Sequence, residues 1–239
     1  ILSEGFLNNL KLCAEINSDL ASCIITSEKL NREFLVNCSL LKNFLLKLKE
    51  KCENFEKINY IQSLETKNSS IEIAVKVFSE KSIKTIKKYA HLLDECLHSI
   101  NDKDSRKIHG EYFRQHLGEF FIGASFTGRA FLKPRGYAGD YEMMNQIYRN
   151  AAEGKSLFEK IIHLYGINES SSVSVRLRKE YLKGKIRSIL DLKQDELTIG
   201  SLACGPAREI IEILSEEQTE KLNKLRIILM DQDHHALLN

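Results

Sequence analysis

Apolar side chains recur every three or four positions through most of the first half of the chain. Two successive sets show this spacing, namely Phe6, Leu10, Cys13, Asn17, Leu20 and Ile24, and then Phe34, Cys38, Leu41, Leu45 and Leu48. This is the period of one helix face. Because neither glycine nor proline occurs between Gly5 and Gly110, the usual helix breakers are missing there. The pattern predicts long helices, with a break at Thr26-Ser27, where a hydroxyl can cap the second helix.

Polar stretches predict two further boundaries. Residues 65–70 form the best candidate loop, since Ser69 and Glu72 stand in capping-box spacing just before a new apolar run. The helix that follows should extend to about Ile100. Residues 101–104 then close it, and another helix is expected with Tyr112, Phe113 and Leu117 on one side.

The pattern changes near residue 118. Five of the twelve glycines fall within 22 residues, at Gly118, Gly123, Gly128, Gly136 and Gly139. Such a segment must turn sharply or let its backbone approach another group closely, and we expect it to be less helical than its surroundings. Helical spacing resumes at Met143 and stops near Gly154. The serine cluster at 170–174 predicts a loop before a basic helix over 175–190.

The last fifty residues change period again. Apolar runs at 197–203 and 226–230 predict two short strands, and residues 206–214 predict a helix between them. Strand, helix and strand in this order form a βαβ unit, which requires a parallel sheet. The sequence therefore predicts an α/β fold, with a helical N-terminal region followed by the start of a doubly wound sheet.

Composition excludes several functional classes. The chain has 239 residues, is 43% hydrophobic, and carries a formal net charge of +2. The length and hydrophobic content are enough for a packed core, and the net charge is too small to indicate nucleic-acid binding. No apolar run approaches the roughly 20 residues of a membrane span. The six cysteines show no C-x-x-C spacing, and the sequence does not open with a basic n-region followed by an apolar h-region, so we expect a reduced, cytoplasmic setting.

Candidate chemistry begins where the first expected strand ends. Small residues from Ser201 to Arg208 connect that strand to a helix, and the second strand ends in the acid Asp231. A ligand can approach backbone amides at such a turn, and an acid at that place can bind two ribose hydroxyls. The plainer alternative is a tight turn and a strand-ending aspartate without any ligand. The missing glycines of G-x-G-x-x-G argue against NAD and a nicotinamide-dependent oxidoreductase.

The turn resembles the first motif of the class I S-adenosylmethionine-dependent methyltransferases. That motif runs apolar, Asp or Glu, apolar, Gly, Cys or Ser, Gly, x, Gly, and the chain departs from it at Ser201, Ala203 and Ala207. The resemblance implies a Rossmann-like methyltransferase sheet, S-adenosylmethionine as cofactor, and Asp231 as the ribose-binding acid. The residues it implies for cofactor binding here are Ser201, Ala203, Cys204, Gly205, Asp231 and Gln232.

A second resemblance involves the run TGRAFLKPRGYAGDYEMMNQIY from Thr127 to Tyr148. It is similar to the segment before the methyltransferase domain in a bacterial subgroup that includes enzymes similar to 3-hydroxypalmitate methyl ester synthases. Proteins of this subgroup also tend toward the S-L-A-C/S-G-P-A-R-E form of the first motif. The resemblance implies a small-molecule acceptor, such as a fatty acid or another carboxylate, and places Arg129 among substrate-binding residues.

The same segment contains side chains suited to a small charged ligand. Arg135 offers a planar fork for a carboxylate of cofactor or substrate, and the ring of Tyr137 could lie near a sulfonium. Asp140 could cap the next helix or hold a substrate hydroxyl. The alternative is a glycine turn in which Arg135 and Asp140 pair with each other.

Other reactive side chains are better explained without catalysis. His234-His235 could bind a metal, but adjacent helical residues diverge, so no metal site is expected. Cys204 would have a lowered thiol pKa at a helix N-terminus, yet cofactor packing is the simpler role. Met143-Met144 is better explained as core than as a cofactor contact. No residue is assigned as catalytic: a carboxylate acceptor would need no general base, whereas an amine or hydroxyl acceptor could need one, and the sequence does not identify it.

We expect three regions: residues 1–117 as a helical lid, dimerisation or regulatory region, 118–192 as a cap over the cofactor site, and 193–239 as the first βαβ unit. The rival hypothesis is a sensor or assembly module with an inactive nucleotide-like site. Ile1 in place of Met, and Asn239 directly after the second strand, suggest a longer protein. Because such sheets have about six or seven strands, residues 1–239 alone are expected to be inactive and to bind cofactor weakly.

Overall fold

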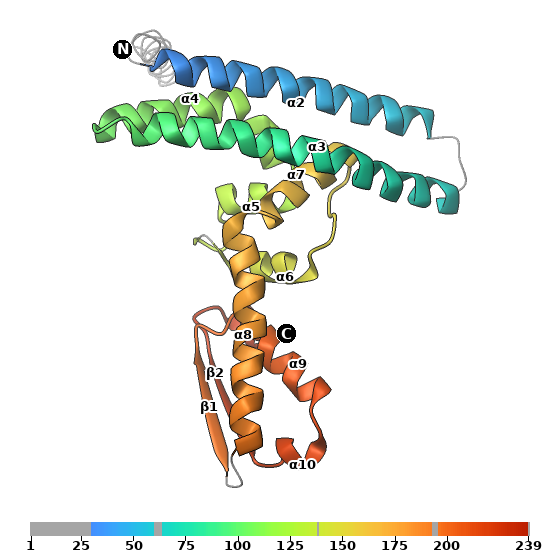
Figure 1. Cartoon of the computed structure of the whole chain (residues 1–239), viewed down its shortest axis with the longest axis vertical. Coiled ribbons are helices and arrows are strands. Elements are labelled where there is room, and N and C mark those ends of the chain that lie inside the picture. Colours follow the sequence, from blue (N-terminus) through green and yellow to red (C-terminus); the bar gives the residue numbers. More distant parts are fainter. Residues whose placement is uncertain (1–29, 60–63, 138, 193–195, 239) are drawn as a thin grey trace, which may run out of the picture. The chain divides into compact units, whose positions relative to one another are not determined.

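The computed structural model describes residues 30–59, 64–137, 139–192 and 196–238, and it is mostly helical (Figure 1). The helices are α2 (Arg32–Ile58), α3 (Leu64–His98), α4 (Lys103–Ile122), α5 (Ser125–Leu132), α6 (Tyr141–Arg149), α7 (Leu157–Ile167), α8 (Ser170–Leu192), α9 (Arg208–Glu216), α10 (Thr219–Leu222) and the 3-10 helix η1 (His234–Leu237). The strands are β1 (Leu197–Leu202) and β2 (Leu225–Met230). Contacts divide the chain into two compact units, Ile1–Lys51 with Lys84–Phe120, and Cys52–Ile83 with Phe121–Asn239.

The core of the first unit confirms the helix face expected on α2. Its buried side chains there are Phe34, Cys38, Leu41, Leu45 and Leu48. Ile86, Leu93 and Cys96 of α3 and Leu117 of α4 are buried as well. This stripe of apolar residues explains why long helices form without glycine or proline, since each helix gains stability by burying one face.

Asn31 begins α2 by capping it. Its side-chain oxygen accepts hydrogen bonds from the backbone amides of Glu33 and Phe34, at 2.8 and 3.2 Å. Its own amide donates to Nε2 of the buried His109 on α4, at 2.9 Å. The predicted break at Thr26-Ser27 and the apolar set from Phe6 to Ile24 lie outside the described residues.

One predicted boundary is wrong. Residues 65–70, expected as a loop, lie inside α3, because α2 ends at Ile58 and α3 already begins at Leu64. Asn59 closes α2, because both its backbone amide and its side-chain amide donate to the carbonyl of Phe55. A polar stretch is equally compatible with the exposed side of a helix, and Ser69 is indeed exposed. The boundary expected at residues 101–104 is confirmed, since α3 ends at His98 and Asp102 accepts from the amide of Ser105.

The glycine-rich segment over residues 118–139 is only partly a loop. Gly118 lies in α4 and Gly128 in α5, so this part is more helical than expected. Close backbone approach is confirmed at Gly128, where a Cβ would lie 2.1 Å from the carbonyl oxygen of Ile122. Sharp turning is confirmed at Gly136 and Gly139, whose φ angles are 82° and 76°.

The start of α8 also differs from expectation. Residues 170–174, predicted as a loop, form its first turns, and α7 before it was not predicted. Serine hydroxyls satisfy nearby carbonyls here, because Ser172 donates to Gly166 and Ser174 donates to Ser170. Serine therefore fits a helix start as well as a loop, and the cluster alone could not distinguish them.

The predicted βαβ unit is confirmed. Strands β1 and β2 pair in parallel from Leu197 opposite Leu225 to Leu202 opposite Met230. One face of this sheet packs on α8 and α9 through Ile199, Ile227 and Ile210. The structure thus consists of helices with a two-stranded parallel sheet, and none of the helices in the described ranges has the length and apolar character needed to span a membrane.

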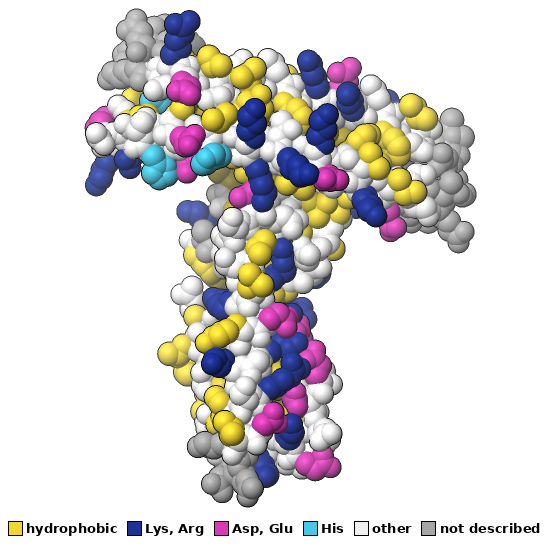
Figure 2. Space-filling model, viewed as in Figure 1, with side chains coloured by type: hydrophobic (Ala, Val, Ile, Leu, Met, Phe, Trp, Pro, Cys, Tyr) yellow, Lys and Arg dark blue, Asp and Glu magenta, His cyan; other side chains and the backbone are white. Residues whose placement is uncertain are grey.

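Ion pairs fasten α8 to α9 beside this sheet. Lys183, only 5% exposed, donates to Glu212 at 2.5 Å and to Glu216 at 3.1 Å. Lys179 also binds Glu212, and Arg187 binds Glu217. Figure 2 shows the alternating basic and acidic side chains on this side of the unit. The pairs set the lateral position of α8 against the βαβ unit.

Candidate functional site

The turn after β1 and the acid after β2 lie side by side. The amide of Cys204 donates to the carbonyl of Met230 at 3.1 Å, which extends the strand pairing into the turn. One carboxylate oxygen of Asp231 accepts from the amide of Gly205 at 2.7 Å, and the other accepts from the amide of Asp233 at 2.8 Å. The predicted juxtaposition at the carboxyl ends of two parallel strands is confirmed.

The backbone of this turn is unusually twisted. Ala203, Gly205 and Ala207 have φ angles of 51°, 54° and 44°, in the left-handed region. Glycine adopts this conformation freely, whereas each alanine loses about 1–2 kcal/mol there. Non-glycine residues held in such conformations cluster at functional sites. The turn is therefore a strained element directly beside an acid.

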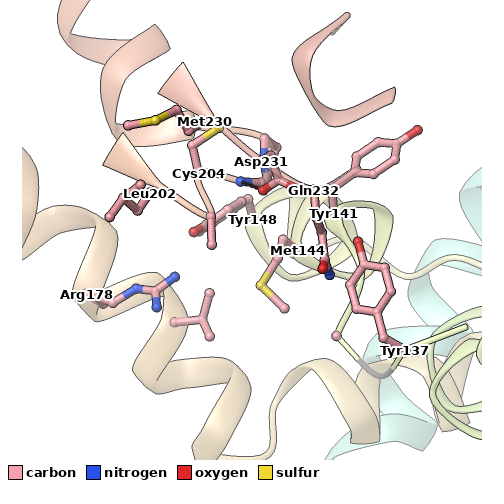
Figure 3. Close-up of a pocket in the computed structure, with 15 residues that line it drawn as sticks. Tyr137, Tyr141, Met144, Tyr148, Arg178, Leu202, Cys204, Met230, Asp231 and Gln232 are labelled. Carbon is pink, nitrogen blue, oxygen red and sulfur yellow. Dashed lines mark hydrogen bonds between the residues drawn. The ribbon is translucent and has the colours of Figure 1, made fainter. Parts of the chain in front are cut away.

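A pocket of about 600 Å³ opens at this edge of the sheet (Figure 3). Its size is within the range typical of small-molecule sites. The lining residues are Tyr137, Gly139, Tyr141, Met144, Tyr148, Val175, Arg178, Leu202, Ala203, Cys204, Gly205, Pro206, Met230, Asp231 and Gln232. They come from the loop before α6, from α6 and α8, and from the ends of both strands.

Six of the eight residues expected to bind the cofactor line the pocket: five follow the two strands, and one lies in the loop before α6. Ala203, Cys204, Gly205, Asp231 and Gln232 all line it, and so does Tyr137. The other two, Ser201 of β1 and Arg135 of the loop, are half-buried and lie outside that lining. Their roles in ligand binding stay predictions.

Three tyrosines line the pocket, namely Tyr137, Tyr141 and Tyr148, and together they form what we call the tyrosine wall. Tyr137 donates from its hydroxyl to Asp233 at 3.3 Å. Burial, followed by the negative charge of Asp233, raises the pKa of Tyr137. Burial also raises the pKa of Tyr148, while a hydrogen bond from Arg178 acts in the opposite direction. The raised pKa values of Tyr137 and Tyr148 favour the neutral phenol, so these two side chains offer hydroxyl groups and π faces rather than a base.

Charge in the pocket is confined to two lining residues among those described. Asp231 lies on the strand side, and Arg178 reaches from α8 on the side of the pocket away from Tyr137 (Figure 3). Neighbouring cations of α8 are paired with acids: Lys179 binds Glu180 and Glu212, and Lys183 binds Glu212 and Glu216. The site thus offers an anionic and a cationic end, joined by aromatic and apolar surface.

Arg135 is paired with Asp233, and not with Asp140 as the alternative held. Its Nη1 donates to both oxygens of Asp233 at 3.1 and 3.2 Å. Its Nη2 donates to the hydroxyl of Tyr141 at 3.0 Å, and the guanidinium carbon lies 4.5 Å from the centre of that ring. Arg135 therefore lies behind the tyrosine wall.

Arg129 and Asp140 bind each other. The Nε of Arg129 donates to both carboxylate oxygens at 2.7 and 2.8 Å, and Asp140 is 1% exposed. Asp140 also accepts from the amide of Met143 at 3.0 Å, which confirms its predicted capping of α6. Neither side chain lines the pocket, so the structure shows them locking α5 to the start of α6, and their assignment to substrate remains a prediction.

Two expectations about reactive side chains can be compared with the structure. A lowered pKa for Cys204 is wrong, because burial and the nearby Asp231 raise the pKa of its thiol. His234 and His235 have ring centres 6.2 Å apart, and no group of three potential ligands for a metal occurs in the described ranges. Neither a thiolate nucleophile nor a metal-bound water is offered by these residues.

Sequence reasoning missed Tyr141, Met144, Tyr148 and Arg178. The first three follow the i, i+3, i+7 spacing of one face of α6, and that spacing is the signal that could have identified them. Met143, on the other side, is buried as expected. Arg178 carries no such signal, since α8 contains many cations and the sequence does not show which of them pair with acids of α9.

No protein-family model matches the chain, and no curated protein or solved structure matches it either. Any functional assignment therefore depends on the geometry of the pocket.

Proposed function

We propose that the chain binds S-adenosylmethionine and belongs to a methyltransferase that acts on a small molecule. The observation that carries the proposal is the hydrogen bond of 2.7 Å between Gly205 and Asp231, beside a pocket of about 600 Å³. A strained turn and an acid, adjacent at the carboxyl ends of parallel strands, form the general arrangement for a nucleoside. The left-handed φ angles of Ala203 and Ala207 support it further, since both stand where the methyltransferase motif has glycine.

The residues present fit the chemistry of this cofactor. A carboxylate has about four lone-pair sites, so Asp231 can accept two ribose hydroxyls besides its two backbone amides. The π faces of Tyr137, Tyr141 and Tyr148 suit a sulfonium, and Arg178 suits a carboxylate. The cofactor supplies a methyl group already activated by a sulfonium.

The protein's part in such a reaction is to position the acceptor and exclude water. Among the described pocket residues, the pKa values of Cys204, Tyr137 and Tyr148 are raised, and no group of three potential metal ligands occurs, so none of these residues stands out as a general base. An acceptor that is already ionised, such as a fatty acid or another carboxylate, suits this lining because it needs no general base. A small-molecule carboxylate is therefore the proposed acceptor class.

Calorimetry on the full-length protein tests the proposal. The wild type should bind S-adenosylhomocysteine and not NAD. Asp231→Asn should weaken that binding by about 10- to 100-fold, since hydrogen bonds to the charged carboxylate are lost. Asp191→Asn is the matched control, because Asp191 is an exposed carboxylate paired with Lys221 and lies outside the pocket.

Two results would contradict the proposal. Absence of binding by the wild type would favour an inactive nucleotide-like site, and equal affinities for the wild type and Asp231→Asn would remove Asp231 from the site.

A further inference from the structure

Asp233 connects the glycine-rich loop to the end of β2. Its side chain is 8% exposed and accepts from Arg135, from the hydroxyl of Tyr137 and from the amide of His235. Arg135 in turn donates to the hydroxyl of Tyr141. Through these bonds a single carboxylate holds two of the tyrosines that line the pocket, and Asp233 itself lies outside that lining.

The charges of this network balance locally. The guanidinium of Arg135 lies 4.5 Å from the ring centre of Tyr141, and Tyr141 lines the pocket. Within the described residues, Asp233 is the carboxylate that binds this guanidinium, and the Nε of Arg135 is buried without a hydrogen-bond partner. A full positive charge behind the tyrosine wall is therefore cancelled by one acid.

We propose that the Arg135–Asp233 pair determines how strongly the pocket prefers a sulfonium over a neutral thioether. Asp233 acts as a positioning residue that also neutralises Arg135, so the wall that faces the ligand presents π electrons without a net positive charge. This inference rests on the proposed function. It adds the reason why a cationic ligand is tolerated beside an arginine.

The test compares S-adenosylmethionine, whose sulfur is positive, with S-adenosylhomocysteine, whose sulfur is neutral. Both ligands have the same adenosine and amino-acid groups, so the ratio of their affinities reports charge near the sulfur. A unit charge within about 10 Å, at an effective dielectric constant between about 20 and 80, changes an affinity by about 2- to 15-fold. Asp233→Asn should therefore lower the relative affinity for S-adenosylmethionine by about that factor.

Arg135→Met should have the opposite effect. It leaves Asp233 uncompensated, which should raise the relative affinity for S-adenosylmethionine by a similar factor. The double variant Asp233→Asn with Arg135→Met removes both charges and should return the ratio to near the wild-type value. A purely structural role would weaken both ligands equally in every variant, and so would not move the ratio.

Equilibrium binding of both ligands to the full-length variants gives the answer. Asparagine keeps an acceptor for the amide of His235, so Asp233→Asn preserves the local cap. If the wild type binds both ligands and the ratio is unchanged in all three variants, the inference is wrong while the proposed function stands. If the wild type binds neither ligand, the proposed function itself fails.

Discussion

His163 is a fully buried titratable side chain outside the pocket lining. Its ring meets Phe126 edge to face, with centroids 6.2 Å apart, and it is 0% exposed. Burial lowers the pKa of His163, and Arg149 and Lys160 act in the same direction, while Glu153 opposes them. The folded state therefore favours the neutral imidazole.

This direction predicts acid sensitivity. Because the unfolded chain has the ordinary histidine pKa of about 6.5, it binds more protons than the folded chain as the pH falls through that value, and stability declines. Urea unfolding at pH 7.5 and 5.5 should show a smaller loss for His163→Leu than for the wild type. Ile162→Val is the control, since it should lower stability by about 1 kcal/mol at both pH values. Equal losses in the wild type and His163→Leu would contradict the prediction.

Single residues show where sequence reasoning was sufficient. Asp231 and Gly205 could be paired in advance, because parallel strands bring their carboxyl ends to one edge of a sheet whatever surrounds them. The partner of Arg135 could not be identified this way. Long flexible side chains choose among several acids within reach, and Asp233 lies 98 positions further along the chain.

At the scale of elements, glycine marks where helices approach each other or turn. The position of α5 requires Gly128, since a Cβ there would lie 2.1 Å from the carbonyl oxygen of Ile122. Backbone atoms cannot move aside as a side chain can. A glycine in the middle of α8, Gly184, has no atom within 4 Å of its ideal Cβ.

These two glycines predict substitutions of opposite sign. Gly128→Ala should destabilise the protein by about 2 kcal/mol or more, because α5 must shift to relieve the overlap. Gly184→Ala should stabilise it by about 0.5–1 kcal/mol through better helix propensity. Denaturant unfolding measures both changes, and a stable Gly128→Ala variant would show that the close approach is not required.

The same scale explains the wrong boundaries. Residues 65–70 are polar and residues 170–174 are serine apart from Val173, and such composition alone does not separate a loop from a turn of a helix. Helix ends depend on which backbone groups find partners, as when Ser172 bonds to Gly166. Apolar periodicity was the better guide, because the buried face of α2 follows directly from it.

At the scale of the whole molecule, the pocket depends on segments that are far apart in sequence. Its walls come from the loop at 137–139, from α6, from α8 and from both strand ends. A ligand that fills it should therefore slow the local opening of all of these segments together.

Hydrogen exchange tests this coupling. With S-adenosylhomocysteine at about 100 times its dissociation constant, amides that exchange by opening of the pocket should slow by up to about 100-fold. The effect should reach α6 and the Ala203–Ala207 turn alike. Amides of α4, none of whose residues lines the pocket, serve as the control. Protection limited to the turn would mean that α6 is not part of the binding site.

The strand–helix–strand order of the last fifty residues, the buried face of α2 and the meeting of turn and acid followed from the sequence alone, because periodicity and chain connectivity are local or directly implied by the βαβ arrangement. The tertiary structure decided which cation faces the pocket, which acid neutralises Arg135, and that Arg129 holds Asp140. Those choices depend on distances between side chains of separate segments. Such distances are set by packing, since the position of α8 follows from its ion pairs with α9 and its apolar contacts with the sheet.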